Sequence, residues 1–479
     1  MIYTSEMLEI DSKQRIKDLE QEVSDLKALV EVLLQEISTL KNKLSLTSKN
    51  SSKPPSIDGF NKIPKSQREK SKTKSGGQLG HEGNTLNMVE APNFIEVHKM
   101  VICEYCRTDL SNVDVLGIDK RQVFDLPPIC LEVTEHQSEI KVCVSCGKRN
   151  KGKFPNNVLA PVQYGTRVKA YCIYFNNYQF IPLDRVSQTM DTLLGIKLNE
   201  SSIFNYTKEL FDNLSITDSI IKSRIISSEV VNLDETGFYV NGSRNWLHSY
   251  STANLSYYSY HEKRGQIAMD EIGILPNFNG IGVHDFWKSY LKYDFSHTLC
   301  NSHHLRELKF INETENFDWS SDIADLLILI KSEVENELFI GNSSLSIEVL
   351  NKYSKQYLSI LNQGLTNYPD KKGKQTKGKN LLDRMIKYKD SVLAFMYNFY
   401  VPFDNNQVVT ELCRSAERDI RMMKLKQKIS GCFRAKNGAE YFCRIRTFIS
   451  TAKKHNENIL QQIYLAFESK DFVPQFILT

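Results

Sequence analysis

The sequence predicts a multidomain α/β protein, and three observations carry this prediction. The chain has 479 residues, which is more than one hydrophobic core normally organises. A heptad repeat of apolar residues fills the N-terminal region, and two Cys-x-x-Cys pairs follow it. Between residues 228 and 312, short β-branched runs alternate with helical patterns and turn residues. We therefore expect several different units along one chain.

The composition excludes several classes of protein. Hydrophobic residues make up 41% of the chain and charged residues 25%, as in an ordinary soluble protein. We find no apolar run long enough to cross a membrane and no secretion signal, so we expect a reducing, cytoplasmic environment for the cysteines. The net charge is only +4, so a prediction of DNA binding depends on where the basic residues lie.

Residues 1–48 are predicted to form a coiled-coil helix. Apolar residues alternate at steps of three and four from Ile16 to Leu44, with β-branched residues at most a positions and leucine at every d position. This pattern favours a parallel two-stranded coiled coil, and hence a homodimer or a larger assembly. The alternative is an amphipathic helix that packs on its own globular domain.

Residues 49–90 are predicted to be a basic, flexible linker that contacts DNA. The stretch is rich in Ser, Lys, Pro and Gly and has too few apolar residues to fold alone. Its lysines suit contacts with phosphate: Lys49, Lys53, Lys62, Lys65, Lys70, Lys72 and Lys74. On charge alone, a solvated linker without a DNA contact explains the composition equally well.

Residues 91–160 are predicted to be a small β module that binds zinc. Two pairs supply four thiols: Cys103, Cys106, Cys143 and Cys146. Each pair offers two thiolates from one tight turn, and four sulfur ligands suit a tetrahedral Zn²⁺ site. Strand-like sequence separates the pairs, at Arg121–Phe124 and Ile129–Glu135. The alternative is a set of unrelated buried thiols.

Residues 161–227 are predicted to be helical. Leu183–Leu194, the turn at Gly195 and a helix capped by Ser201 suggest two helices joined by a glycine turn. The same arrangement occurs in DNA-reading helix-turn-helix units and in ordinary helical bundles, so this segment stays an open candidate for DNA binding.

Residues 228–312 hold the first part of the predicted core. We expect three antiparallel strands, a helix, a parallel strand, a second helix at Trp287–Leu291 and a fifth strand, which is the element order of ribonuclease H. Asp234 is expected at the C-terminal end of a short first strand, followed at once by a turn at Gly237, and Asp285 ends the fourth strand. This order places the two strands side by side, so the two carboxylates are expected to meet.

A third acid is expected from a later helix. Residues 313–403 are too long for a loop and are predicted to form an α-helical insertion with a basic hairpin. Residues 404–455 supply the last core helix, with Glu417 near its start, and residues 456–479 a C-terminal tail. Three acids from separate elements can hold two divalent cations, which is the chemistry that cuts and rejoins phosphodiesters.

Basic residues near the acids are the candidate DNA contacts. Arg421 and Lys424 follow Glu417 at helical spacing, so a carboxylate and two cations share one helix face. The full set is Lys263, Arg264, Arg418, Arg421, Lys424, Lys428 and Arg434. An isolated Glu-x-x-x-Arg pair on a helix is usually a solvated ion pair. Here the density of cations favours a face that follows a phosphate backbone.

Three histidines lie beside these motifs. His284 precedes Asp285, and His303 and His304 follow the fifth strand. They are candidates for orienting the phosphate or the acids, and the alternative is a buried, hydrogen-bonded structural role, which we favour for at least one of the pair.

With these motifs the chain resembles transposases of insertion-sequence family 66, the TnpC type. The matching stretches are Asn50–Ser56, Gly76–Gly83, the two cysteine pairs, Leu233–Thr236, Val283–Tyr290, Leu299–Leu308 and Lys428–Arg434. The resemblance implies a DDE transposase with a ribonuclease H-like core, in which Asp234, Asp285 and Glu417 hold two Mg²⁺ or Mn²⁺ ions. It also implies double-stranded DNA as substrate, both element ends and target, accessory proteins of the same element, and a nucleoid location in a prokaryote.

One segment departs from the family pattern. The family has Asp-Asn-Asn-x-Ala-Glu-Arg without interruption, whereas eight residues, 408–415, separate Gln407 from Ala416 here. They either extend the helix by about two turns and leave Glu417 in place, or move it out of reach with Glu411 as a poor substitute. The second case implies an inactive zinc-containing DNA-binding protein, such as a decayed transposase or a repressor. A nuclease or resolvase without strand transfer would keep the same acids.

Overall fold

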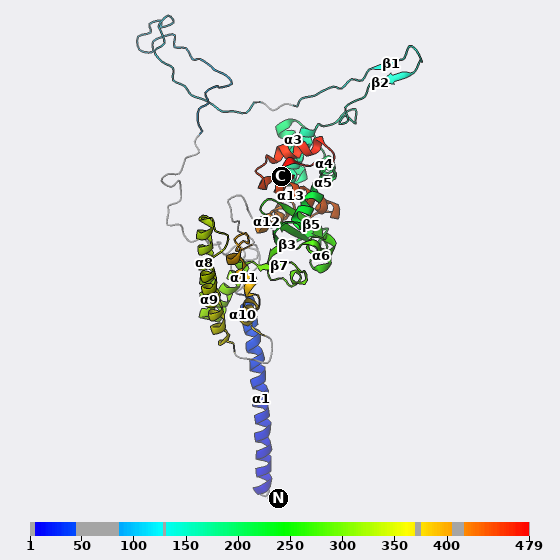
Figure 1. The fold of residues 1–479 in the computed structure, drawn as a ribbon. Helices are drawn as coiled ribbons and strands as arrows, with labels where there is room; N and C mark the ends of the chain where they lie inside the picture. The colour runs from blue at the N-terminus through cyan, green and yellow to red at the C-terminus, as the bar shows by residue number, and fades with distance from the viewer. Residues whose placement is uncertain (1–4, 45–85, 128–130, 369–374, 405–415, 479) are drawn as a thin grey trace.

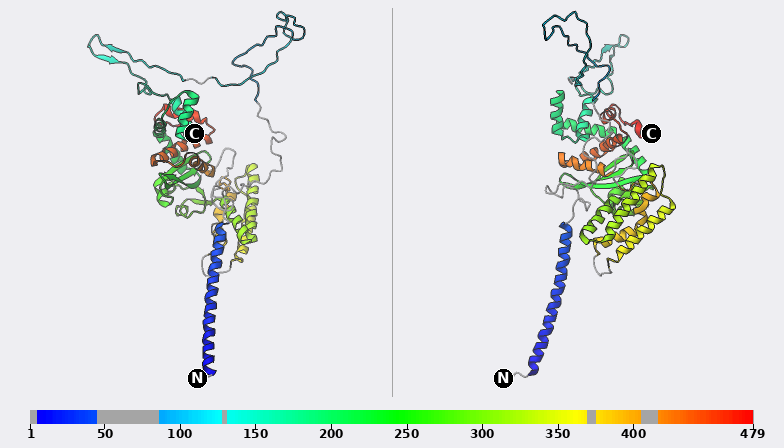
Figure 2. Two further views of the ribbon diagram at one scale, coloured as in Figure 1. Left: turned by 180° about the vertical axis from the view of Figure 1, so that it is seen from behind. Right: turned by 90° about the vertical axis from the view of Figure 1, so that its left-hand side faces the viewer.

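The computed structural model describes residues 5–44, 86–127, 131–368, 375–404 and 416–478 of the chain. It is a mixed α/β structure in which helices surround a five-stranded sheet (Figure 1). The N-terminal helix and the stretch from residue 86 to 160 extend away from this globular part (Figure 2). Among the described helices, none has both the length and the apolar character needed to cross a membrane.

The central sheet has the strand order β5–β4–β3–β6–β7. Its strands are β3 (Val230–Val240), β4 (Ser243–Ser251), β5 (Ser256–His261), β6 (Ile281–His284) and β7 (Ser296–Leu299). The first three pair antiparallel, whereas β6 pairs parallel with both β3 and β7. The predicted series of three antiparallel strands followed by parallel ones is therefore confirmed. The predicted end of the first strand at Asp234 is wrong, because β3 pairs with β4 through Gly237 and continues to Val240.

The connection between β6 and β7 differs from the prediction. We expected a helix from Trp287, but the chain forms only a short 3₁₀ turn at Tyr290–Lys292. The carboxylate of Asp285 accepts a hydrogen bond from the backbone N–H of Trp287 at 3.0 Å, and such an Asx turn competes with helix formation. The ring of Tyr290 is then buried in the core below the sheet.

Helices cover both faces of the sheet. On one face α5 (Ser215–Ile226) and α6 (Gln266–Ile272) pack on the apolar side chains of β3. On the other face lie α12 (Ala416–Ser430) and α13 (Lys436–Lys454). Two hydroxyl groups of α13 accept hydrogen bonds from the backbone of β5, so the helix also covers the outer edge of that strand.

The helices before the sheet form one bundle with the C-terminal residues. This bundle contains α2 (Thr166–Ile173), α3 (Leu183–Leu194), α4 (Glu200–Asn213), α13 and α14 (Ile459–Glu468). Residues 456–479, expected as a tail, thus include a packed helix. The predicted glycine turn is present, with Gly195 at a φ of 64°, but Asn199 and not Ser201 precedes the second helix. Because α4 buries Ile203 and Leu210, its packing favours the ordinary bundle.

The predicted insertion is helical and has its own core. After α7 (Asn301–Glu315) come α8 (Asp318–Phe339), α9 (Ile347–Leu365), α10 (Lys377–Lys387) and α11 (Lys389–Tyr397). Helices α10 and α11 are separate, because the backbone leaves the helical region at Tyr388. Helix α11 contacts β7, so the insertion adjoins the edge of the sheet. Part of the predicted basic hairpin, residues 369–374, lies outside the described residues.

The stretch from residue 86 to 160 has little regular structure. Its described residues contain one antiparallel hairpin, β1 (Ile140–Val142) with β2 (Arg149–Lys151). The strands expected at Arg121–Phe124 and Ile129–Glu135 do not form among the described residues. An alternating pattern makes a strand only when a partner strand and a surface to bury are present. Here the apolar side chains, such as Val123 and Phe124, are exposed.

Helix α1 (Ser5–Leu44) confirms the predicted N-terminal helix and leaves its apolar stripe exposed. From Ile16 to Leu40 the a and d side chains have between 44% and 55% of their surface accessible. The helix therefore does not bury this stripe on its own globular domain, which was the alternative interpretation. A stripe of this kind is stable in water mainly when another helix covers it.

Gly282→Ala is expected to destabilise the sheet. A Cβ atom on this residue of β6 would overlap the buried ring of Phe295, and β6 is held between two paired strands. We expect the free energy of unfolding in urea to fall by about 1–3 kcal/mol. The matched control is Gly165→Ala, where the added Cβ meets no atom within 4 Å, and we expect a change of about 0.5 kcal/mol or less. Equal stability of both variants would contradict this packing.

Candidate functional site

Two of the predicted acids meet on neighbouring strands. Strand β3 pairs parallel with β6 up to Asn232 and Val283. Two residues further on come Asp234, in the middle of β3, and Asp285, directly after β6, and residues in this register lie side by side on the same face of a sheet. Each carboxylate accepts a backbone N–H bond, Asp234 from Glu235 at 2.8 Å and Asp285 from Trp287. The sheet thus brings together two acids that lie far apart in the sequence.

The third predicted acid, Glu417, lies in the first turn of α12, and its side chain is outside the described residues. Helix α12 runs along β3, since Met423 packs in the same core cluster as Phe238 and the ammonium of Lys424 donates to the carbonyl oxygen of Gly237. After α12, Phe433 pairs with the far end of β3, so helix and strand run in the same direction.

The level of Glu417 along β3 follows from this alignment. Glu417 precedes Lys424 by seven residues of helix, a rise of about 10 Å. Asp234 precedes Gly237 by three residues of strand, which is also about 10 Å. The backbone of α12 therefore places Glu417 level with Asp234. Residues 405–415, including Glu411 and the inserted segment, lie outside the described residues.

Glu235 is a site residue that the sequence analysis missed. Its side chain is only 2% exposed and receives three hydrogen bonds, two from Arg264 and one from the hydroxyl of Tyr290. Burial raises the pKa of Glu235 to about 7, the charge of Asp285 adds to this effect, and Arg264 opposes it. The alternation of the strand predicts that Asp234 and Glu235 point to opposite faces, which was the available signal.

Arg264, which follows β5, lies beside Glu235 and Asp285, whereas its neighbour Lys263 is exposed to solvent. The Nε of Arg264 donates to Glu235 at 2.9 Å. Its guanidinium also lies 4.2 Å from the ring centre of Trp287 and 5.0 Å from that of Trp246. Stacking and two hydrogen bonds to one oxygen of Glu235, from Nε and one amino group, fix the guanidinium plane, and its remaining N–H groups suit an anion.

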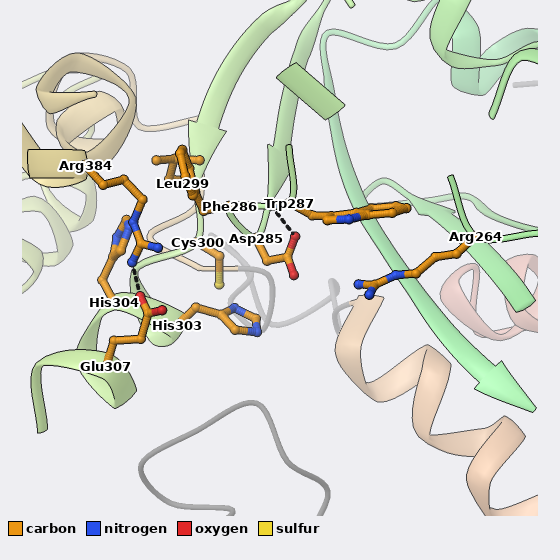
Figure 3. A pocket seen from close by; sticks show the side chains of 10 residues that line it. All are labelled: Arg264, Asp285, Phe286, Trp287, Leu299, Cys300, His303, His304, Glu307 and Arg384. Carbon is orange, nitrogen blue, oxygen red and sulfur yellow. Dashed lines mark hydrogen bonds and ion pairs between the residues drawn. The ribbon is translucent and has the colours of Figure 1, made fainter. Parts of the chain in front are cut away.

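A cavity of about 220 Å³ adjoins Asp285 (Figure 3). It lies between the ends of β6 and β7, the start of α7 and the insertion helix α10. Its lining residues are Arg264, Asp285, Phe286, Trp287, Leu299, Cys300, His303, His304, Glu307 and Arg384. Asp285, His303 and Arg264 approach it from different sides in Figure 3.

The three histidines have different surroundings. His284 is buried on the opposite face of β6, with its Nε2 3.0 Å from Nδ1 of His297, and burial lowers its pKa to about 3. His304 is also buried, with Nδ1 3.1 Å from Oδ1 of Asn301, and burial lowers its pKa well below the ordinary value. Both rings are therefore neutral parts of the core. His303 and His304 both line the cavity, and of these two only His303 is partly exposed.

The basic residues predicted for DNA fall into two groups. Arg421, Lys428 and Arg434 are exposed on α12 and the loop after it. Lys424 instead donates to the backbone of β3, and burial lowers its pKa, an effect that nearby Arg244 reinforces. Its ammonium therefore holds the helix on the strand in this structure. The side chain of Arg418 is outside the described residues.

The cysteine pairs form two separate turns of the same kind. In each, the first cysteine exchanges backbone hydrogen bonds with the residues four and five positions later, as at Cys103 with Arg107 and Thr108. Hydrogen bonds from Thr108 lower the pKa of Cys106 to about 7, and backbone hydrogen bonds also lower that of Cys143. No group of three or more metal-binding side chains is assembled among the described residues. Each turn thus fits half of a four-cysteine site.

Comparison with known proteins gives two family matches. The model described as "Transposase IS66 family" matches residues 161–441, more than half of the chain. The model described as "Family of unknown function (DUF6444)" matches residues 8–87. A comparison with curated proteins gives no match.

Proposed function

This chain belongs to the IS66 transposase family, and on that premise we propose that it is a DDE transposase that cleaves the ends of an insertion sequence and joins them to target DNA. The observation that carries the proposal is the parallel pairing of β3 with β6, which brings Asp234 and Asp285 together, with the start of α12 level with Asp234. The strand order and the helices on both faces also fit a ribonuclease H-like core.

Asp234, Asp285 and Glu417 are the residues that would hold two Mg²⁺ or Mn²⁺ ions. Carboxylate oxygens are the ligands that these ions prefer, and the backbone N–H bonds to the two aspartates orient them as ligands. When bound, the ions would activate the attacking water, and later the 3′-hydroxyl group, and stabilise the leaving oxygen.

The chain's other residues supply binding and orientation. Arg264, fixed by Glu235 and stacked on Trp287, is placed to hold the scissile phosphate beside Asp285. The exposed cations Arg421, Lys428 and Arg434 extend this positive surface along α12 and would follow the double-stranded DNA of the element ends and target. We propose that this reaction takes place at the nucleoid of a prokaryote, with accessory proteins of the same element as further partners.

The experiment is cleavage of DNA that carries the two ends flanking this gene. We expect the full-length protein with Mg²⁺ or Mn²⁺ to release 3′-hydroxyl ends at the element boundaries, and chelation to stop the reaction. Products joined to a second DNA molecule would show strand transfer. Cleavage without joined products would favour a nuclease or resolvase with the same acids.

An inactive DNA-binding protein is the second candidate function. The observation that favours it is the segment 408–415, which interrupts the family pattern directly before Glu417. Such a protein would bind the element ends and repress, but it would not cut them. Specific binding without metal-dependent cleavage under any of the conditions above would establish this candidate in place of the transposase.

Leu26→Asp is expected to separate a dimer formed through α1. Leu26 is a d residue of the exposed stripe, and a buried carboxylate at this position would face its copy in the partner helix. We expect the natural protein to have the mass of a dimer or larger assembly in light scattering and the variant that of a monomer. Ala28→Asp, on the outer face of the same helix, is the control. A monomeric natural protein would overturn the coiled coil.

Zinc content is expected to depend on the paired cysteines. We propose that Cys103, Cys106, Cys143 and Cys146 together hold one Zn²⁺ ion, since each turn offers two thiolates. Mass spectrometry of the purified protein should find about one zinc per chain, and Cys103→Ser should remove most of it. Cys432→Ser, at an exposed cysteine outside both turns, should not. An unchanged zinc content in Cys103→Ser would contradict the proposed site.

A further inference from the structure

The cavity beside Asp285 has walls from two different units. Asp285, Trp287 and Cys300 belong to the sheet and its loops, whereas Arg384 comes from α10 of the helical insertion. Figure 3 shows the Arg384 side chain reaching from its helix toward Glu307 and the cavity. The insertion therefore contributes directly to the surroundings of a predicted metal ligand.

Arg384 is held rigidly at this position. Its guanidinium lies 4.8 Å from the ring centre of Phe286 and donates a hydrogen bond to Glu307, and only 14% of its side chain is exposed. Its Nε is buried and has no acceptor among the described residues. This nitrogen has almost no accessible surface, so a ligand in the cavity would meet the other N–H groups of the guanidinium, which lines it.

The remaining walls suit a flat organic ring. Four of the ten lining residues, Phe286, Trp287, Leu299 and Cys300, are apolar or aromatic, and the other six are polar or charged. Pockets that bind a nucleobase outside the double helix combine aromatic or apolar side chains for stacking with polar groups for hydrogen bonds to the base edge. A volume of about 220 Å³ has room for one base but not for a base pair.

We propose that this cavity receives one unstacked base of the DNA strand, next to the phosphate held at Asp285, and that Arg384 donates hydrogen bonds to that base. The inference rests on the proposed transposase function and assigns to the insertion a part in positioning the strand. Purine and pyrimidine bases all carry acceptor atoms that a guanidinium can reach.

A mismatch scan of the element-end DNA tests this proposal. Single mismatches are placed, one at a time, at each base pair near the cleaved phosphodiester, and single-turnover cleavage by the full-length protein is measured as a function of protein concentration. A mismatched base costs less to unstack, so one position should give apparent binding on the order of tenfold tighter. The other positions should show little gain.

Variants of α10 separate this role from a merely structural one. Arg384→Ala should lose the gain at that one position, and Arg384→Lys, which keeps the charge and lacks the planar guanidinium, should lose most of it. Lys387→Ala removes an exposed cation of the same helix and should keep the gain in full. Thermal unfolding of each variant identifies any general loss of structure.

Two results would overturn the inference. In one, the natural protein cuts the matched DNA but no mismatch position gains affinity, which removes the base pocket and leaves the transposase function intact. In the other, Arg384→Ala and Arg384→Lys, both folded, keep the full gain. If the natural protein neither binds nor cuts the end DNA, the proposed function fails first and the base pocket fails with it.

Discussion

Asp234→Asn and Asp285→Asn are each expected to lower the rate of strand cleavage by about a thousandfold or more, while the affinity for end DNA stays within a few-fold of the natural value. Removing a ligand charge forfeits several kcal/mol of transition-state stabilisation, and each 1.4 kcal/mol is about tenfold in rate. Binding changes little because phosphate contacts with cations supply most of the affinity. Single-turnover cleavage and filter binding measure the two quantities separately.

The matched control is Asp294→Asn. Asp294 lies in the same β6–β7 connection as Asp285, but it is exposed and outside the cavity. We expect this variant to cut DNA at the natural rate. If Asp234→Asn or Asp285→Asn cuts DNA at more than a tenth of the natural rate, the carboxylate is not a metal ligand. The pairing of β3 with β6 would then serve the fold and not catalysis.

Glu417→Gln is expected to lower cleavage by at least about a hundredfold, whereas Glu411→Gln is not. The physical reason is the alignment of α12 with β3, which Met423 and Lys424 fix and which places Glu417 level with Asp234. This alignment is fixed by residues of α12 and β3, and the inserted residues 408–415 lie outside the described residues. Cleavage by the two variants, measured side by side on the same end DNA, distinguishes the acids.

The opposite result has a definite meaning. If Glu411→Gln inactivates the protein and Glu417→Gln does not, the inserted segment has replaced the third acid. If both variants retain the natural rate, the third ligand lies elsewhere, and Glu235 becomes the first residue to test because it is buried beside Asp285.

The sequence was informative where local patterns decide structure. The strands and their order could be predicted, because short apolar runs that end in glycine or asparagine turns specify a meander. The meeting of Asp234 and Asp285 followed from that order, since residues in register on adjacent parallel strands lie side by side. The heptad repeat likewise predicted α1 as a single helix.

Other features depend on packing that the sequence does not reveal. The sequence does not show how the neighbouring acids Asp234 and Glu235 differ in role. In the folded protein, the pleat of β3 directs Asp234 to one face and Glu235 to the other, where it pairs with Arg264. Helical spacing grouped Lys424 with Glu417 correctly, but it did not show that this face lies against β3. Arg384 lies far from the acids in sequence, and only the docking of the insertion brings it to the cavity.

The central claim is that Asp234, Asp285 and Glu417 surround one metal site, and iron-directed cleavage of the protein tests it most directly. Fe²⁺ in place of Mg²⁺, with ascorbate and peroxide, cuts the polypeptide next to the bound ion. The account predicts cuts near all three residues in the natural protein, loss of all three cuts in Asp285→Asn, and suppression by excess Mg²⁺. Cuts near Asp234 and Asp285 without one near Glu417, or no cut at β3 at all, would contradict it.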